Sequence, residues 1–248
     1  MDYKDYQKIN QEYFWHKARN IFINIILSKY LKNNDKKNNI LEIGCGTGYQ
    51  SDVISRYGNY TGLEKNPETM EELKKINKKV INSNIEDYET EEKFETICLF
   101  DVLEHIKNDL GAIKKINFLL KNNGLFFITV PAKKILFSEH DLAMDHYRRY
   151  EKEELRDLLI ENNFVIKEIG HWNCLLFPLI FVFRIIKKII YKKNKNKQEH
   201  ESDVQNLPKI INKILYSILI FENKLTKIGL KIPFGLSLYV VAQKKYEN

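Results

Sequence analysis

The fold is decided by the stretch Ile40-Leu41-Glu42-Ile43-Gly44-Cys45-Gly46-Thr47-Gly48. Its apolar start predicts a buried strand, and glycines at alternate positions predict a turn where the backbone can bend sharply. Residues without a Cβ also let a ligand approach the main-chain N–H groups. The next residues, Tyr49 to Tyr57, are expected to form a helix whose positive N-terminal end lies beside that ligand. Together these elements predict the first unit of a nucleotide-binding α/β fold.

The glycine spacing separates two ligand classes. A dinucleotide-binding turn reads G-x-G-x-x-G and would need a glycine at position 49, where this chain has Tyr49. The pattern here is E-x-G-x-G-x-G, beginning at Glu42. A second acidic residue, Glu64, ends the next apolar run and is placed to accept hydrogen bonds from both hydroxyls of a ribose. The alternative is a turn that only links a strand to a helix.

A second pattern, Asp101-Val102-Leu103-Glu104-His105-Ile106, follows the apolar run Thr96 to Phe100. Ligands of open α/β sheets bind at the carboxyl ends of the strands, so residues 101–105 should face the ligand. The two patterns together resemble the motifs of class I S-adenosylmethionine-dependent methyltransferases, in particular small-molecule enzymes of the ubiquinone-biosynthesis type. The resemblance implies S-adenosylmethionine as cofactor and S-adenosylhomocysteine as product.

The resemblance also implies which residues hold the cofactor. The glycine turn would lie beside the methionine part, Glu64 at the ribose, and Asn84 and Ile85 at the adenine. The family usually has an acidic residue where this chain has Asn84, whose amide oxygen can also accept a hydrogen bond, and Glu86 is the fallback. The full set of expected cofactor-binding residues is Arg19, Glu42, Gly44, Cys45, Gly46, Gly48, Glu64, Lys65, Asn84, Ile85, Asp101, Val102 and Leu103.

Residues up to about Lys32 are expected to be helical and contain an aromatic–basic cluster from Tyr13 to Arg19. In the family that the chain resembles, an N-terminal helix often covers the cofactor. Arg19 would then pair with the methionine carboxylate, and Tyr13 and Trp15 would contact the substrate. The alternative is an amphipathic helix packed on the sheet, with its basic residues in solvent.

The segment Ser138 to Tyr150 leaves the carboxyl end of a central strand and is rich in titratable groups. We expect a loop over the substrate pocket, in which His140 or His146 removes a proton from the substrate. His105 is a further catalytic candidate by topology, although it could equally serve to start a helix. The expected substrate-binding residues of this segment are Asp141, Arg148, Arg149 and Tyr150. The alternative is that the two arginines pair with Glu residues and cap the next helix.

Seven strands are predicted in a Rossmann-like, doubly wound sheet whose last strand is antiparallel. The expected division is a helical lid at 1–35, a cofactor-binding core at 36–170, a helical insertion at 171–232 and a final edge strand at 233–248. In the insertion, the apolar run Cys174 to Phe183 precedes a basic stretch from Arg184 to Lys197, and Leu207 to Leu230 is expected to be helical. The segment 174–197 either contacts a membrane surface or forms a cap or dimer contact, and we favour the cap.

Composition narrows the function less than the motifs do. The net charge of +7 would suit nucleic acid or anionic lipid, but a compositional bias along the whole chain explains it equally well. Three cysteines, Cys45, Cys98 and Cys174, lack metal-type spacing, so we expect buried thiols and no metal site. No apolar run reaches the roughly 18 residues of a membrane-spanning helix. We expect a cytoplasmic protein, in peripheral contact with the inner face of the membrane if segment 174–197 meets lipid.

The flanking patterns narrow the resemblance to one bacterial subgroup. They are the Tyr13-Phe14-Trp15 start, the His140 to Tyr150 segment, the run Trp172 to Pro178 and the close Pro233 to Leu238. Methyltransferases of this subgroup often accompany cell-envelope or capsule synthesis, which implies a sugar, phosphorylated or lipid-linked acceptor and, as first expectation, O-methylation. An RNA-modifying enzyme and a non-catalytic cofactor-binding or membrane-surface protein are the alternatives, although we find no RNA-binding module and expect no nucleic-acid partner.

Overall fold

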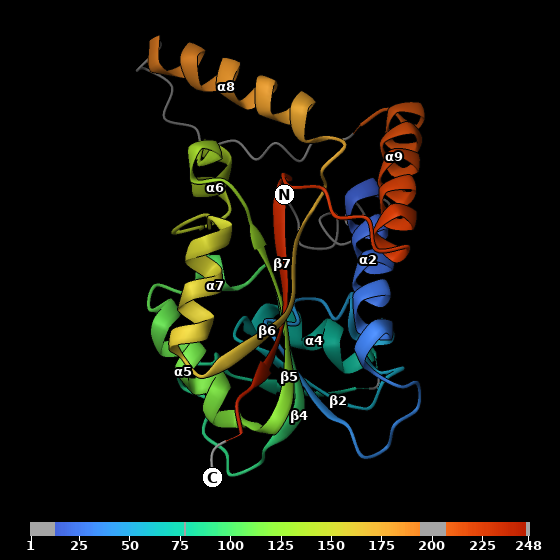
Figure 1. The fold of residues 1–248 in the computed structure, drawn as a ribbon, viewed down its shortest axis with the longest axis vertical. Helices are drawn as coiled ribbons and strands as arrows, with labels where there is room; N and C mark the ends of the chain where they lie inside the picture. Colours follow the sequence, from blue (N-terminus) through green and yellow to red (C-terminus); the bar gives the residue numbers. More distant parts are fainter. Residues whose placement is uncertain (1–12, 77, 194–206, 247–248) are drawn as a thin grey trace.

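The computed structural model describes residues 13–76, 78–193 and 207–246. It contains one seven-stranded sheet in the order β3-β2-β1-β4-β5-β7-β6 (Figure 1). Strand β7 is antiparallel to both of its neighbours, and the other pairs are parallel, which confirms the predicted Rossmann-like fold. The predicted edge position of the last strand was wrong, because β7 lies between β5 and β6 and pairs with both. The strands are β1 (Asn39–Ile43), β2 (Asn59–Glu64), β3 (Lys79–Asn82), β4 (Phe94–Phe100), β5 (Leu120–Pro131), β6 (Phe164–Trp172) and β7 (Ser237–Lys244).

Alternate side chains of each strand point to opposite sides of the sheet, so both faces present apolar side chains. Helices cover both of these faces. In β1, Leu41 and Ile43 face one apolar cluster while Ile40 faces the other. The first cluster is covered by helices α5 (Asp109–Leu119) and α7 (Lys152–Glu161). The second is covered by α2 (Phe14–Tyr30), α3 (Ser51–Ile54) and α9 (Lys209–Lys227). Most of α2 is therefore an amphipathic helix packed on the sheet.

Three local predictions were wrong in their extent. The helix expected over Tyr49 to Tyr57 is the short α3, because tight turns after Val53 and Ile54 return the chain to β2. The expected loop from Ser138 to Tyr150 contains helix α6 (Glu139–Ala143). Strand β6 continues to Trp172, paired with β7 apart from a register shift between Ile166 and Glu168, so the insertion begins after position 172.

The remaining described helices are α4 (Pro67–Lys75), α8 (Phe177–Lys193) and the 3-10 turns η1 (Leu103–His105) and η2 (Lys134–Leu136). Helix α9 packs beside α2, as a cap would, whereas α8 projects at one end of the molecule (Figure 1). The predicted cysteine burial is confirmed, since Cys45, Cys98 and Cys174 are free, buried thiols. Two parts of the predicted elements lie outside the described residues. They are residues 1–12 of the predicted lid and residues 194–206 in the polar middle of the predicted insertion.

Candidate functional site

The glycine turn after β1 has the backbone that its sequence predicts. Gly44, Gly46 and Gly48 have φ angles of 68°, 54° and 75°, a region that favours glycine. A Cβ on Gly44 would lie 2.5 Å from a methyl group of Val102, whereas a Cβ on Gly46 would meet nothing within 4 Å. Gly44 thus lets the turn pack against the loop after β4. Gly46 leaves its backbone open to a ligand.

Two buried carboxyl groups flank this turn. Glu64 accepts hydrogen bonds from the backbone N–H groups of Gly46 at 2.7 Å and Asn66 at 2.9 Å. Glu42 accepts a bond from the Tyr60 hydroxyl at 2.5 Å. Burial raises the pKa of Glu42 to about 8, although the Tyr60 bond and the positive charge of Arg19 oppose this rise. Cys45 lies against the same strands, since a Cβ on Gly62 would be 2.8 Å from its sulfur.

Arg19 reaches the site from α2. Its guanidinium forms an ion pair with Asp101, at 2.5 Å, and lies under the Trp15 ring, 4.9 Å from the ring centroid. Asp101 has a positive φ of 54°, so the chain turns sharply as it leaves β4. The buried Arg19 Nε has no hydrogen-bond partner within the described part of the chain. This geometry fits the predicted pairing of Arg19 with a carboxylate.

At the end of the site where the adenine is expected, the polar side chain of Asn84 already has a partner. The Asn84 amide nitrogen donates to the Asp87 carboxylate at 2.6 Å, and its oxygen accepts from the Asp87 backbone at 2.8 Å. Asn84 thus closes a local turn, next to the buried Ile85. Lys65 is exposed and directly follows Glu64 at the end of β2. The adenine contacts of Asn84 and Ile85 remain predictions.

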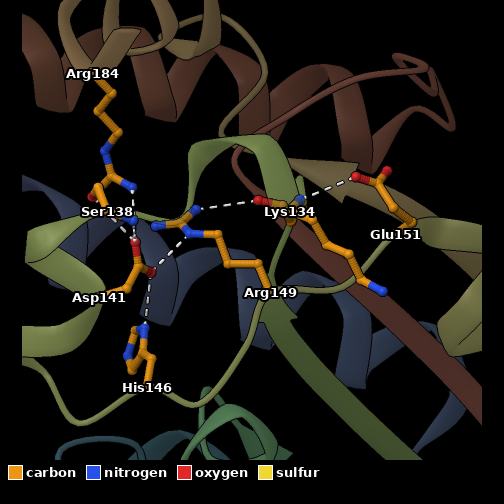
Figure 2. A network of polar contacts seen from close by, with 8 residues as sticks. Lys134, Ser138, Asp141, His146, Arg149, Glu151 and Arg184 are labelled. Atoms are coloured by element: carbon orange, nitrogen blue, oxygen red, sulfur yellow. Dashed lines mark hydrogen bonds and ion pairs between the residues drawn. The ribbon is translucent and has the colours of Figure 1, made fainter. Parts of the chain in front are cut away.

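A second group of polar residues is built around Asp141, which is completely buried on α6 (Figure 2). The Arg149 Nε donates to Asp141 Oδ1 at 2.7 Å, and His146 Nδ1 lies 3.0 Å from the same oxygen. Arg184, from α8, approaches the other oxygen at 3.8 Å. Burial alone would raise the pKa of Asp141, but the His146 hydrogen bond and the Arg149 and Arg184 charges hold it below its usual value.

His146 also faces the residues after β4. Its ring lies edge-on to His105, with 4.6 Å between centroids, and Glu104 completes a cluster whose donor atoms lie within 4.8 Å of one another. Burial and the nearby Asp101 raise the pKa of Glu104, while burial and the His146 charge lower the pKa of His105 to about 4. Such a set can relay a proton or hold a cation, which the sequence analysis did not predict.

Several predicted substrate residues have structural partners instead. Arg148 pairs with Asp109 at 2.5 Å, and the Tyr150 hydroxyl donates to the same carboxylate at 2.9 Å. The alternative in which the two arginines pair with Glu residues was wrong, since both arginines bind Asp residues. Tyr13 and Trp15 belong to an aromatic group at the start of α2, where Trp15 contacts Trp172. His140 lies on α6 outside the cluster of Glu104, His105 and His146.

Two residues that shape the site were missed. Glu104 stands within the Asp101 to Ile106 pattern, so its position beside His105 was the available signal. Arg184 gave no signal, because nothing in its local sequence indicates that α8 returns to Asp141.

The chain is similar to known methyltransferases over most of its described length. A family described as a methyltransferase domain matches residues 14–169. The ubiquinone biosynthesis O-methyltransferase of Pelagibacter ubique is 29% identical over 180 residues, which cover 63% of this chain and 75% of that enzyme. The (S)-coclaurine N-methyltransferase of Papaver somniferum is 32% identical over 127 residues, 45% of this chain and only 35% of the poppy enzyme.

Solved structures agree on the fold. A methyltransferase from Thermotoga maritima superposes with a TM-score of 0.61 at 12% identity, covering 98% of this chain and 95% of that one. A phosphoethanolamine N-methyltransferase from Haemonchus contortus, solved with S-adenosylhomocysteine, has a TM-score of 0.56 at 16% identity and is matched over 90% of this chain and 52% of its own.

Proposed function

The chain belongs to the methyltransferase domain family and is an S-adenosylmethionine-dependent methyltransferase, and on that premise we propose that it methylates a hydroxyl group of a small molecule. The observation that carries the hydroxyl assignment is the Asp141–His146 pair at the carboxyl edge of the sheet. An amine can accept a methyl group without a positioned base, whereas a hydroxyl oxygen benefits from losing its proton as the new bond forms.

The cofactor would lie across the ends of β1, β2 and β4. The open backbone at Gly46 suits close approach of the ligand, the Glu64 carboxylate has lone pairs left for the ribose hydroxyls, and Arg19 would take the methionine carboxylate. Bound S-adenosylmethionine supplies a methyl group already activated by its sulfonium. The protein then has to align the acceptor oxygen and manage one proton.

His146 is the group we assign to that proton. The Asp141 carboxylate only accepts hydrogen bonds when ionised, so whenever the His146 imidazole is neutral its proton stays on Nδ1 and Nε2 is left to accept the substrate proton. Arg149 and Arg184 hold Asp141 ionised and in place. The pKa of His105 is lowered, so this residue is uncharged near neutral pH. It lies beside His146 and adds no positive charge there.

The acceptor class follows from the residues that flank the core rather than from the core itself. Their resemblance to a subgroup linked with cell-envelope or capsule synthesis supports a sugar, a phosphorylated or a lipid-linked intermediate. We therefore propose a cytoplasmic enzyme that works at the inner face of the membrane.

Methyl transfer from S-adenosylmethionine carrying a labelled methyl group tests the proposal directly. The acceptors would be sugars, sugar phosphates and catechols, each compared with an amine of similar size. We expect transfer to a hydroxyl acceptor, with a fall in kcat of about 10²-fold or more for His146→Gln. The matched control His140→Gln should keep most of the rate, and the fall for His146→Gln should become smaller as pH rises. Transfer to amines alone, or equal rates for both variants, would contradict the hydroxyl assignment.

A further inference from the structure

The insertion between β6 and β7 carries the charge excess of the entire chain. Of the 40 Lys and Arg residues, seven lie in residues 171–198, which contain no Asp or Glu, and the other 33 are balanced by 33 acidic residues. This stretch alone therefore holds seven positive charges and no negative one, a number equal to the net charge of the chain. A local basic segment calls for a local partner.

Helix α8, which begins this basic segment, turns an apolar stripe outward. Its members follow one another at helical spacing and are 67%, 55%, 55% and 52% exposed: Leu179, Val182, Phe183 and Ile186. The opposite side of the helix is the anchored one, because Ile180 packs on the core and Arg184 reaches Asp141. The helix is thus held by its polar and inner contacts while its apolar side faces away from the protein.

The beginning of α9 carries further exposed apolar residues. Ile210, Ile211 and Ile214 are exposed there, and Figure 1 shows the start of α9 and all of α8 at one end of the long axis of the molecule. We call the seven exposed residues of these two helices the α8–α9 rim. None of the described helices is long and apolar enough to cross a membrane.

The rim lies on the same side as the site. Helix α6, which follows the carboxyl end of β5, lies near the end of the molecule that carries α8 (Figure 1). The ion pair between Arg184 and Asp141, at 3.8 Å, joins α8 to the residue that orients His146 (Figure 2). Whatever binds the rim is therefore close to the proposed acceptor pocket.

We propose that the α8–α9 rim binds the surface of an anionic lipid bilayer. The apolar side chains would enter the boundary between headgroups and acyl chains, and Lys209 and Lys213, which are exposed at the start of α9, would bind anionic headgroups. A second copy of the chain fits poorly, because it would bring two segments of the same positive charge together. The inference rests on the proposed function in one respect: it gives the site access to an acceptor held in the membrane.

Co-sedimentation with vesicles tests the proposal. Vesicles of phosphatidylcholine with phosphatidylglycerol should bind the wild-type protein, and vesicles of phosphatidylcholine alone should bind it far less. The double variant Phe183→Ser/Ile186→Ser should bind the anionic vesicles at least about tenfold more weakly, because it removes two large apolar groups. Neutralising Lys209 and Lys213 with Gln should weaken binding about fivefold for each charge lost.

Phe118→Ser is the matched control, since Phe118 is 58% exposed near the end of α5. It lies close to the start of β5, at the opposite end of the strand from α6. This variant should leave vesicle binding unchanged. No binding to anionic vesicles, equal loss in the control, preferential binding of single-stranded RNA, or a dimer that dissociates on Phe183→Ser would each overturn the proposal. Calorimetry with S-adenosylmethionine on the same preparations separates this outcome from failure of the proposed function, because rim variants should bind the cofactor normally.

Discussion

The two halves of the site each bury a carboxyl group, and the two groups behave in opposite ways. Glu42, beside the glycine turn, has burial as its dominant influence and a pKa raised to about 8. Asp141, on α6, is buried as deeply, yet its hydrogen bond from His146 and its two arginine neighbours lower its pKa. Glu42 therefore holds a proton near neutral pH in the structure without cofactor, and Asp141 is ionised.

The difference follows from how each half is built. The half that we propose to bind the cofactor consists of backbone groups and short-range contacts, and it would bind a charged ligand. The acceptor half is made of side chains brought from α6, α8 and the segment before α7, and its charges are already paired. The first half should thus respond to the cofactor and to pH, and the second to loss of any one of its members.

The largest effect should come from Asp141→Ala. The substitution leaves the buried Arg149 without its carboxylate, frees His146 and removes the capping contacts with Ser138. We expect a loss of about 3–5 kcal/mol in the free energy of unfolding, measured by urea denaturation. Asp157→Ala, which removes an exposed ion pair with Arg156, should leave the free energy of unfolding nearly unchanged. A similar small cost at Asp141 would mean that the buried network contributes little.

The pH dependence of stability should separate the two halves next. The pKa of Glu42 lies at about 8 in the folded protein against an ordinary 4.5, so the folded state keeps a proton that the unfolded chain has lost. Stability should therefore fall as pH rises from about 5 to 8, by up to roughly 1.4 kcal/mol per pH unit from this group, and then level off. Asp141 has the opposite sign, and its contribution is lost as pH falls below 3.8.

Glu42→Gln isolates the first of these terms. The amide can still accept from Tyr60, but it does not titrate, so the variant should show a flatter stability curve between pH 5 and 8. Glu86→Gln, at an exposed carboxylate, is the control and should follow the wild type. Parallel curves for wild type and Glu42→Gln would show that Glu42 is already ionised over this range.

The smallest effect should come from Arg148→Gln. Its partner Asp109 is partly exposed, so loss of the ion pair should cost about 1 kcal/mol or less of stability. Because the Arg148 guanidinium is already bound to Asp109 and to the Lys107 carbonyl, kcat and KM should change little. A rise in KM of tenfold or more would restore Arg148 to the substrate-binding role that its sequence suggested.

The same contrast explains what the sequence could predict. In the cofactor half, the strands, the turn and the acidic residue can be predicted from short stretches of sequence. Gly44 and Gly46 directly follow β1, and Glu64 ends β2. In the acceptor half, the segment Ser138 to Tyr150 was identified, but the roles within it were not. Arg148 and Tyr150 turn to Asp109, and Asp141 turns to Arg184, partners that are distant in the sequence.

Helix α8 shows the same limit. An apolar run followed by lysines can pack inward or outward, and the sequence analysis favoured a cap. The structure divides the insertion instead: α9 packs on α2, and α8 leaves Leu179 and Phe183 exposed. Which face of such a helix is buried depends on contacts such as that between Arg184 and Asp141, which no local periodicity contains.

The most direct measurement is calorimetric titration with S-adenosylmethionine, S-adenosylhomocysteine and NAD of the wild type, Glu64→Gln and Glu68→Gln. Glu68 is an exposed carboxylate at the start of the neighbouring α4 and provides the matched control. We expect micromolar binding of the first two ligands to wild type and Glu68→Gln, at least about tenfold weaker binding to Glu64→Gln, and no binding of NAD. Binding of NAD, or equal affinity of all three proteins for S-adenosylmethionine, would contradict the placement of the cofactor at the glycine turn.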